Sequence, residues 1–131
     1  MKSPRGLSGA IPGGGGTQRL PRFVGMRKAK EMIFTSRLIS AQEALELGVV
    51  NMVLPKEKLS EEAAKICEKM KSKSPASLRL AKQAINLAFS VPLDEGLRIE
   101  SGLYSKVLTS QDAKEGLGAF LEGRRPNYTS K

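Results

Sequence analysis

Apolar residues recur at intervals of three and four along most of this chain, with polar residues between them. This spacing places apolar side chains on one face of a helix, so it predicts a mainly helical protein. Serine residues precede several of these segments and glycine residues follow them, as is typical of helix starts and ends. The predicted helices cover residues 17–20, 26–35, a short segment between Ser40 and Gly48, 60–73, 75–88, 93–108 and 110–122.

Particular residues mark the ends of the first helices. Pro21 is expected to disturb the helix over 17–20, and Gly25 to separate it from the next helix. Ser40 and Glu43 form a capping box, in which the serine accepts a hydrogen bond from a backbone amide and the glutamate side chain reaches back. Gly48 can end that helix, because glycine readily takes the left-handed conformation.

The same spacing predicts which side chains face inward. Cys67, the only cysteine, falls on such a face. It is interpreted as a small hydrophobic residue, because no histidine is present to activate its thiol. The inward residues expected along the chain are Ala29, Ile33 and either Met32 or Phe34, then Ala63, Ile66 and Met70, then Leu78, Ala81, Ile85 and Ala88, and finally Ala113, Leu117, Phe120 and Leu121.

One segment has the pattern of a β-strand. Residues 49–54 are mostly apolar or β-branched, and Pro55 ends them. An isolated strand pair is marginal in water without a larger sheet. The expected fold class is therefore mainly α with a minor β-strand or hairpin. Either that hairpin packs on the helices, or the sheet belongs to sequence outside this chain.

Composition narrows the possible chemistry. The 131 residues are enough for one domain, and 40% of them are hydrophobic, so a core can form. The lack of histidine excludes an imidazole base or ligand. A single cysteine excludes an internal disulfide and a zinc site built on thiolates. No apolar run is long enough to span a bilayer, so we expect a soluble protein without metal.

The net charge of +9 is concentrated near the N-terminus. Residues 1–37 hold eight basic side chains and one acid, whereas residues 38–131 hold fourteen basic and twelve acidic ones. Such a basic segment could face a phosphorylated ligand, a nucleic acid or an acidic protein surface. RNA binding is thus an alternative function, although only Phe23 and Phe34 offer aromatic stacking among these basic residues.

Four segments, in order, resemble those of one enzyme family. They are IPGGGGTQRL at 11–20, the helix at 25–35, SAQEA through GVV at 40–50, and EGLGAFLEGR at 115–124. Over about residues 9–131 the chain is similar to the crotonase superfamily of enoyl-CoA hydratases and isomerases, in particular to enoyl-CoA and methylglutaconyl-CoA hydratases. One such motif would be weak support, but four in the right order and spacing are specific.

The resemblance implies the C-terminal helical half of a crotonase-like (ClpP/crotonase) α/β fold. Residues 9–131 would form this part of the domain, and residues 1–8 an irregular lead-in. The N-terminal half of a family subunit carries most of the sheet, the amides of the oxyanion hole and the first catalytic glutamate. We therefore expect a fragment of an enzyme of fatty-acid or branched-chain acyl-CoA catabolism, inactive alone, with a CoA thioester as substrate and no cofactor.

The resemblance also bears on the second catalytic glutamate. In the family it lies seven residues before the proline of IPG, and Arg5 holds that position here. Arginine cannot act as a general acid or base at neutral pH, so no catalytic residue is intact. Either residues 1–8 are foreign to the family, which we favour, or Arg5 is a substitution that binds anionic thioesters.

Four residues are candidates for substrate binding. Gly13 matches the glycine whose backbone amide holds the reacting water, although a glycine run also permits any close approach of loop and helix. Gly14 belongs to the same run, at a helix start that attracts anions. Phe120 matches a family position that covers the adenine of CoA, or it is a core residue. Arg124, or its neighbour, could replace the family lysine whose position Gly123 holds.

The resemblance implies partners as well. Crotonase trimers pack through C-terminal helices, so the chain is expected to form a homo-oligomer or to associate with a family subunit. It would bind acyl-CoA once an N-terminal half completes the site. Its expected location is the cytoplasm, or the mitochondrial matrix of a eukaryote.

Overall fold

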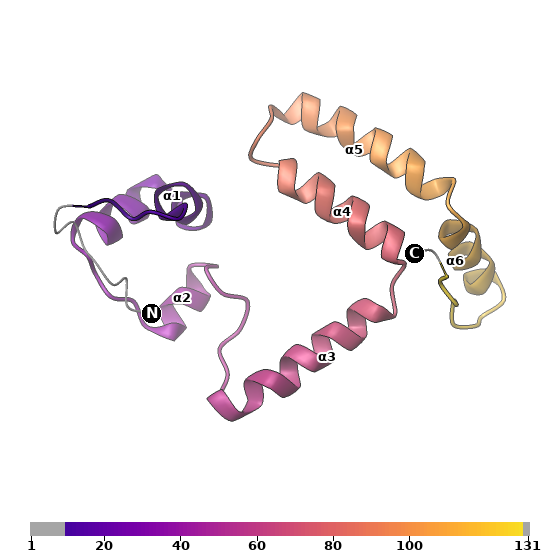
Figure 1. Ribbon diagram of the computed structural model, residues 1–131, viewed down its shortest axis with the longest axis horizontal. Coiled ribbons are helices and arrows are strands. Elements are labelled where there is room, and N and C mark those ends of the chain that lie inside the picture. Colours follow the sequence, from indigo (N-terminus) through magenta and orange to yellow (C-terminus); the bar gives the residue numbers. More distant parts are fainter. Residues whose placement is uncertain (1–9, 130–131) are drawn as a thin grey trace. The chain divides into compact units, whose positions relative to one another are not determined.

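The computed structural model describes residues 10–129 of the chain. Arg5 and the predicted lead-in over residues 1–8 lie outside these residues. The described residues form helices and no strand, which confirms a mainly helical fold (Figure 1). The α-helices are α1 (Gly16–Phe34), α2 (Ala41–Glu46), α3 (Leu59–Lys71), α4 (Pro75–Leu87), α5 (Leu93–Leu108) and α6 (Gln111–Leu121), and a 3-10 turn spans Lys56–Lys58. The chain divides into two compact units, and the boundary between them lies between Leu59 and Ser60.

Helix α1, in the first unit, is broken at Gly25, as predicted. Gly25 has φ 77° and ψ 156°, a backbone region that glycine alone occupies without strain. Pro21, by contrast, lies inside the helix, and our prediction that it disturbs the helix was wrong. Pro21 is the sixth residue of α1, where it removes one amide donor, and the helix nevertheless continues through it.

The end of α1 is fixed by a Schellman motif. Ser36 takes the left-handed conformation with φ 54°, and its backbone N–H donates to the Ile33 carbonyl at 3.3 Å. The N–H of Arg37 donates to the Met32 carbonyl at 3.2 Å. This pair of bonds satisfies carbonyls that would otherwise lack a donor at the end of the helix.

Arg37 ties the end of α1 to α2. Its guanidinium donates to the Glu31 carboxylate at 2.8 Å and to the Glu43 carboxylate at 2.8 Å. These bonds raise the pKa of Arg37 and lower the pKa of Glu43. The Ser40 hydroxyl caps α2 as predicted, because it accepts the Glu43 N–H at 3.0 Å. The Glu43 side chain pairs with Arg37, so an ion pair replaces the second half of the predicted capping box.

We predict that Ser36→Gly raises the free energy of unfolding by roughly 0.5–1 kcal/mol. A residue with a Cβ pays about 1–2 kcal/mol in the left-handed conformation, and glycine avoids this cost while losing more backbone entropy. Urea unfolding followed by helical circular dichroism would measure the change. Ser40→Gly, which removes the cap of α2, is the matched control and should not stabilise. A lower unfolding midpoint for Ser36→Gly than for the original chain would refute the prediction.

Residues 49–54 do not form the predicted strand, so this prediction was wrong. Gly48 takes the left-handed conformation as predicted, with φ 68°. The N–H groups of Val49 and Val50 then donate to the Ala44 carbonyl at 2.9 and 3.3 Å and hold the chain against the end of α2. A strand needs a neighbour to supply its hydrogen bonds, and the described residues contain no second strand.

In the second unit, α4 and α5 pack side by side and α6 packs against α5 (Figure 1). The Ser74 hydroxyl caps α4 by accepting the Ser77 N–H at 3.1 Å, and Pro75 follows in the first turn, as predicted. Helix α5 has the bounds that the sequence predicts. Gly123, with φ 67°, follows the end of α6.

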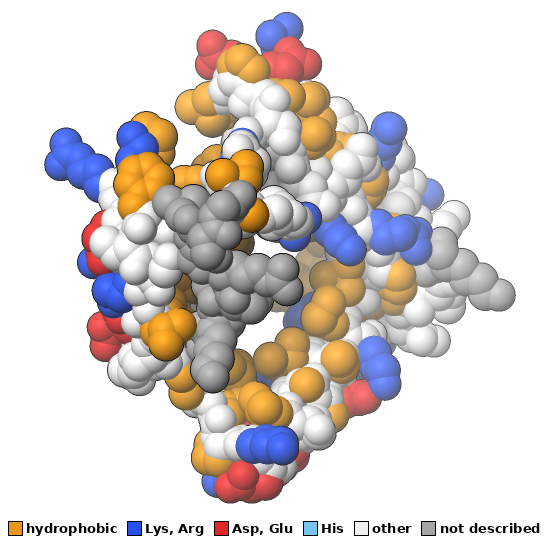
Figure 2. All heavy atoms as spheres, turned by 60° about the vertical axis from the view of Figure 1, so that its left-hand side comes forward, with side chains coloured by type: hydrophobic (Ala, Val, Ile, Leu, Met, Phe, Trp, Pro, Cys, Tyr) orange, Lys and Arg blue, Asp and Glu red, His pale blue; other side chains and the backbone are white. Residues whose placement is uncertain are grey.

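Most of the predicted inward faces are exposed, which corrects the sequence analysis. Ala29 and Met32 are buried as predicted, but Cys67 is exposed and α3 has no buried residue. Hydrophobic side chains accordingly cover many parts of the surface (Figure 2). Spacing along a helix fixes which side chains share a face, but not whether another element covers that face. The buried hydrophobic residues of the described chain are Ala29, Met32, Ala44, Leu103 and Ala119.

None of the helices in residues 10–129 is long and apolar enough to cross a membrane.

Candidate functional site

The glycine run forms a tight loop at the start of α1. The Gly16 N–H donates to the Gly13 carbonyl at 3.3 Å, and the Gly15 carbonyl accepts the Arg19 N–H at 2.8 Å. Gly14 and Gly15 have φ 62° and 87°, so both need glycine. A Cβ at Gly16 would lie only 3.0 Å from Cβ of Pro12.

Gly13 differs from the glycines that follow it. A Cβ placed there would meet no atom within 4 Å, and its φ does not lie in the left-handed region. The fold therefore gives no steric reason for glycine at position 13. Because Gly13 is exposed, its surroundings could admit a small ligand or water.

The basic residues of α1 are open to solvent. Arg19, Arg22, Arg27, Lys28 and Lys30 are all exposed, and Lys28 lies 3.8 Å from Glu31. Because these side chains are exposed, an anionic partner has steric access to them. RNA binding stays a prediction, and a filter-binding titration that shows no salt-sensitive affinity for AU-rich RNA would remove it.

Phe120 lies on the exposed side of α6. It is 81% exposed, and the neighbouring Leu117 and Leu121 are 63% and 75% exposed. The alternative interpretation of Phe120 as a core residue is therefore wrong in this structure. Its ring is available to a ligand or to another protein surface.

Arg124 is held by carboxylates of its own chain. Its guanidinium donates to both oxygens of Glu115, with Nη2 to Oε2 at 2.9 Å, and Nε pairs with Glu122. These bonds raise the pKa of Arg124. Glu115 also accepts the Asn127 N–H at 2.7 Å, and the Tyr128 hydroxyl lies 3.2 Å from the Cβ position of Gly116. Arg124 thus fastens the segment after α6 back onto that helix.

We predict that this segment loosens as the pH falls from 4.5 toward about 2. The bonds from Arg124 and from the Asn127 amide lower the pKa of Glu115 from 4.5 to about 2. A folded-state pKa below the unfolded value contributes stability that is fully present above pH 4.5 and is lost as the pH falls through about 2. The Asn127 amide chemical shift, followed by NMR against pH, would report this. Glu115→Gln should abolish the dependence, and a titration that persists in Glu115→Gln would contradict the assignment.

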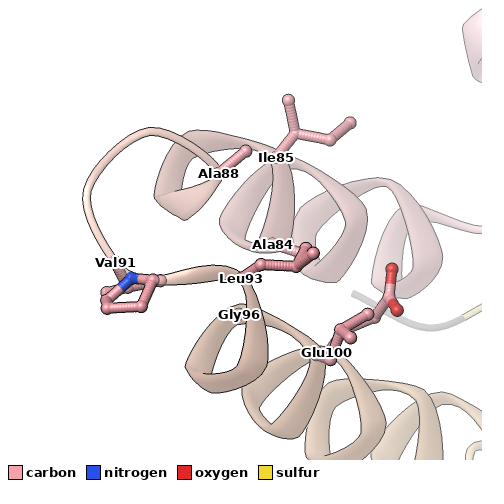
Figure 3. Close-up of a pocket in the computed structure, with 9 residues that line it drawn as sticks. Ala84, Ile85, Ala88, Val91, Leu93, Gly96 and Glu100 are labelled. Atoms are coloured by element: carbon pink, nitrogen blue, oxygen red, sulfur yellow. The ribbon is translucent and has the colours of Figure 1, made fainter.

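An apolar groove of about 240 Å³ lies between the end of α4 and the start of α5 (Figure 3). Ile85, Ala88, Leu93 and Leu97 contribute apolar side chains, and Glu100 is the ionisable residue among the described residues that line it. One carboxylate without a second acid or base does not make a catalytic pair.

The structure places the predicted site residues in separate parts of the chain. Gly13 and Gly14 belong to the first unit, whereas Phe120 and Arg124 lie in or just after α6 of the second. In residues 10–129, no group of acidic, histidine or cysteine side chains could hold a metal ion.

Sequence reasoning missed two polar contacts of the second unit. The Ser74 hydroxyl donates to the Asp112 carboxylate at 2.6 Å, and both residues are buried. Glu115 was assigned no contact, although it holds Arg124 and the Asn127 amide. Ser74 and Asp112 are 38 residues apart, so no local pattern could have paired them.

Comparisons with known proteins identify the family of this chain. A family model described as enoyl-CoA hydratase/isomerase matches residues 2–131. The chain belongs to the enoyl-CoA hydratase/isomerase family. The mitochondrial enoyl-CoA hydratase of Pongo abelii is 44% identical over 125 residues, which are 95% of this chain and 43% of that protein. The mitochondrial methylglutaconyl-CoA hydratase of Mus musculus is 42% identical over 122 residues, 90% of this chain and 39% of that protein.

A solved structure extends the comparison to the fold. The crystal structure of enoyl-CoA hydratase from Bacillus anthracis matches with a TM-score of 0.89 at 49% identity, over 94% of this chain and 48% of that one. The fold is thus consistent with the helical C-terminal part of a crotonase fold. This member of the enoyl-CoA hydratase/isomerase family spans less than half the length of the relatives named above.

Proposed function

We propose that this chain supplies the C-terminal, acyl-CoA-binding part of an enoyl-CoA hydratase/isomerase, and that it is inactive until an N-terminal part completes the site. The observation that carries the proposal is the family match over residues 2–131. The exposed apolar side chains of α4, α5 and α6 support it, because a chain with so small a core gains stability by covering them.

In the completed subunit, hydration would use groups from the N-terminal part and from this chain. Hydration of an enoyl thioester requires amide donors that stabilise the developing charge on the thioester oxygen. It also requires carboxylates that activate water and deliver a proton. The resemblance assigns the oxyanion hole and the first glutamate to the N-terminal part. In this chain it assigns the reacting water to the Gly13 amide, with Gly14 beside it, and it places Arg5 where the second glutamate would lie.

Phe120 and Arg124 would act at the CoA end of the substrate. The exposure of the Phe120 ring supports a contact with adenine, because the described residues leave 81% of this residue open to solvent. Arg124 is already paired with Glu115 and Glu122, so a phosphate would have to share the guanidinium with these carboxylates or displace them. Its contribution to binding is therefore expected to be smaller than that of Phe120.

Partners and location follow from the same proposal. The chain would associate with a second copy or with a family subunit through its exposed helices, and would need no cofactor besides the CoA thioester substrate. We place it in the cytoplasm, or in the mitochondrial matrix of a eukaryote. The relatives with mitochondrial names support the second location.

We predict that the chain alone neither hydrates crotonyl-CoA nor binds it measurably. Adding the N-terminal part of the Bacillus anthracis enzyme should create binding, because that part supplies the rest of the site. Calorimetry would measure binding, and the enone absorbance would measure turnover. Phe120→Ala should weaken binding by the completed subunit, with Leu121→Ala as the matched exposed control. Sustained turnover by the chain alone, or no binding after completion, would refute the proposal.

A further inference from the structure

Helix α6 packs against the rest of its unit through a face made of small and polar residues. Asp112 and Ala119 are 2% and 0% exposed, and they are seven residues apart, about two helical turns, so they share one face. Leu117, Phe120 and Leu121 lie elsewhere around the helix and are largely exposed. The buried face thus offers one carboxylate and one methyl group, while the apolar side chains face outward.

Burial of apolar surface by itself favours the opposite orientation. Turning α6 about its axis would bring Leu117, Phe120 and Leu121 toward the helices on which α6 packs. The hydrophobic effect favours such burial, since it acts on apolar area without regard to direction. A specific, directional contact can oppose the turn.

The Ser74 hydroxyl provides this contact. Ser74 Oγ donates to Asp112 Oδ2 at 2.6 Å, and the two residues are 6% and 2% exposed. The same Oγ accepts the Ser77 N–H at 3.1 Å, so the start of α4 holds it in place. Turning α6 would break the bond and leave the Ser74 hydroxyl, which is buried at the start of α4, without its acceptor, which is unfavourable.

We infer that Ser74 and Asp112 form a positioning pair, which holds α6 with its apolar face outward and so presents Phe120 to the ligand. The inference rests on the proposed function only in naming acyl-CoA as that ligand. The orientation of α6 is inferred from the bond between Ser74 and Asp112 and does not depend on which ligand binds. Buried polar groups act in this way where they select one arrangement among several apolar packings.

Thiol labelling measures the orientation of α6 directly. In a Cys67→Ser background, Leu117→Cys places a thiol on the apolar face, and Gln111→Cys places one at an exposed position on another side of the helix. Labelling with iodoacetamide, followed by mass spectrometry, gives the two rates. Ser74→Ala is expected to slow labelling at position 117 several-fold relative to position 111, because the apolar face turns inward. A purely stabilising role would instead speed labelling at both positions.

Two further variants keep the test decisive. Asp112→Asn, which retains the shape of the side chain but not its charge, should slow labelling at position 117 to an intermediate extent. Ser74→Thr keeps the hydroxyl and should restore the original ratio of rates. An unchanged ratio in Ser74→Ala, faster labelling at both positions, or no rescue by Ser74→Thr would each overturn the positioning role.

The ligand part of the inference has its own readout. Crotonyl-CoA added to the completed subunit should protect a thiol placed by Leu117→Cys, beside Phe120, and should not protect one placed by Gln111→Cys. Protection that disappears in Ser74→Ala and returns in Ser74→Thr supports presentation of Phe120. Absence of protection, with the labelling ratio still dependent on Ser74, would overturn the proposed function and leave the positioning pair standing.

Discussion

Arg5→Glu is expected to raise the rate of crotonyl-CoA hydration by a completed subunit about 10²–10⁴-fold, the range that a positioned general acid or base contributes. Arg5 lies seven residues before Pro12, where the resemblance places the second catalytic glutamate. A guanidinium keeps its proton at neutral pH, whereas a carboxylate can release and accept one. The family match begins at residue 2 and so includes Arg5, which supports a common register there. Loss of the enone absorbance gives the rate.

Arg5→Gln is the matched control for this experiment. Glutamine has nearly the size of glutamate but cannot exchange a proton, so its rate should stay at that of the original chain. Gly6→Glu, one residue further along, tests the register. Equal rates for Arg5→Glu and Arg5→Gln would contradict the assignment of position 5, and would favour the interpretation that residues 1–8 are foreign to the family.

Ser74→Ala is expected to lower the free energy of unfolding by about 2–4 kcal/mol. Removing the cap of α4 costs about 1 kcal/mol. Removing a donor from the buried Asp112 carboxylate costs a further 1–3 kcal/mol, roughly, because that group cannot turn to water instead. Urea unfolding followed by helical circular dichroism would measure the sum.

Ser110→Ala separates these two contributions. The Ser110 hydroxyl caps α6 by accepting the Ala113 N–H at 3.1 Å, the same distance as in the cap at Ser74. Its loss should cost only the cap, about 1 kcal/mol. The difference between the two variants then measures the bond to Asp112. Equal losses for Ser74→Ala and Ser110→Ala would show that this bond adds no stability.

Only those parts of the candidate site that depend on local sequence patterns could be predicted. The glycine loop was found from its sequence, since the positive φ angles at Gly14 and Gly15 need glycine itself. Phe120 was found through the resemblance, but its exposure was not, because the spacing of Leu117, Phe120 and Leu121 fits a buried face equally well. The ties of Arg124 to Glu115 and Glu122 depend on the fold of the segment after α6, which no periodicity describes.

The sequence by itself determined most of the helix ends, although it did not predict that α1 continues through Pro21. Ser40 and Ser74 lie at the helix starts where they were expected and cap α2 and α4, and Gly48 takes the left-handed conformation after α2. These features depend on hydrogen bonds between residues only three or four positions apart, so they form wherever the local residues allow.

Only the tertiary structure decided which faces are buried and which segments pair. Residues 49–54 have the composition of a strand, but a strand forms only beside another, and the described chain provides none. In α6 the buried residues are Asp112 and Ala119 rather than the larger apolar side chains. The physical reason is common to both cases: burial and strand pairing need groups distant in the sequence, such as Ser74 for Asp112, and their position is a property of the folded chain.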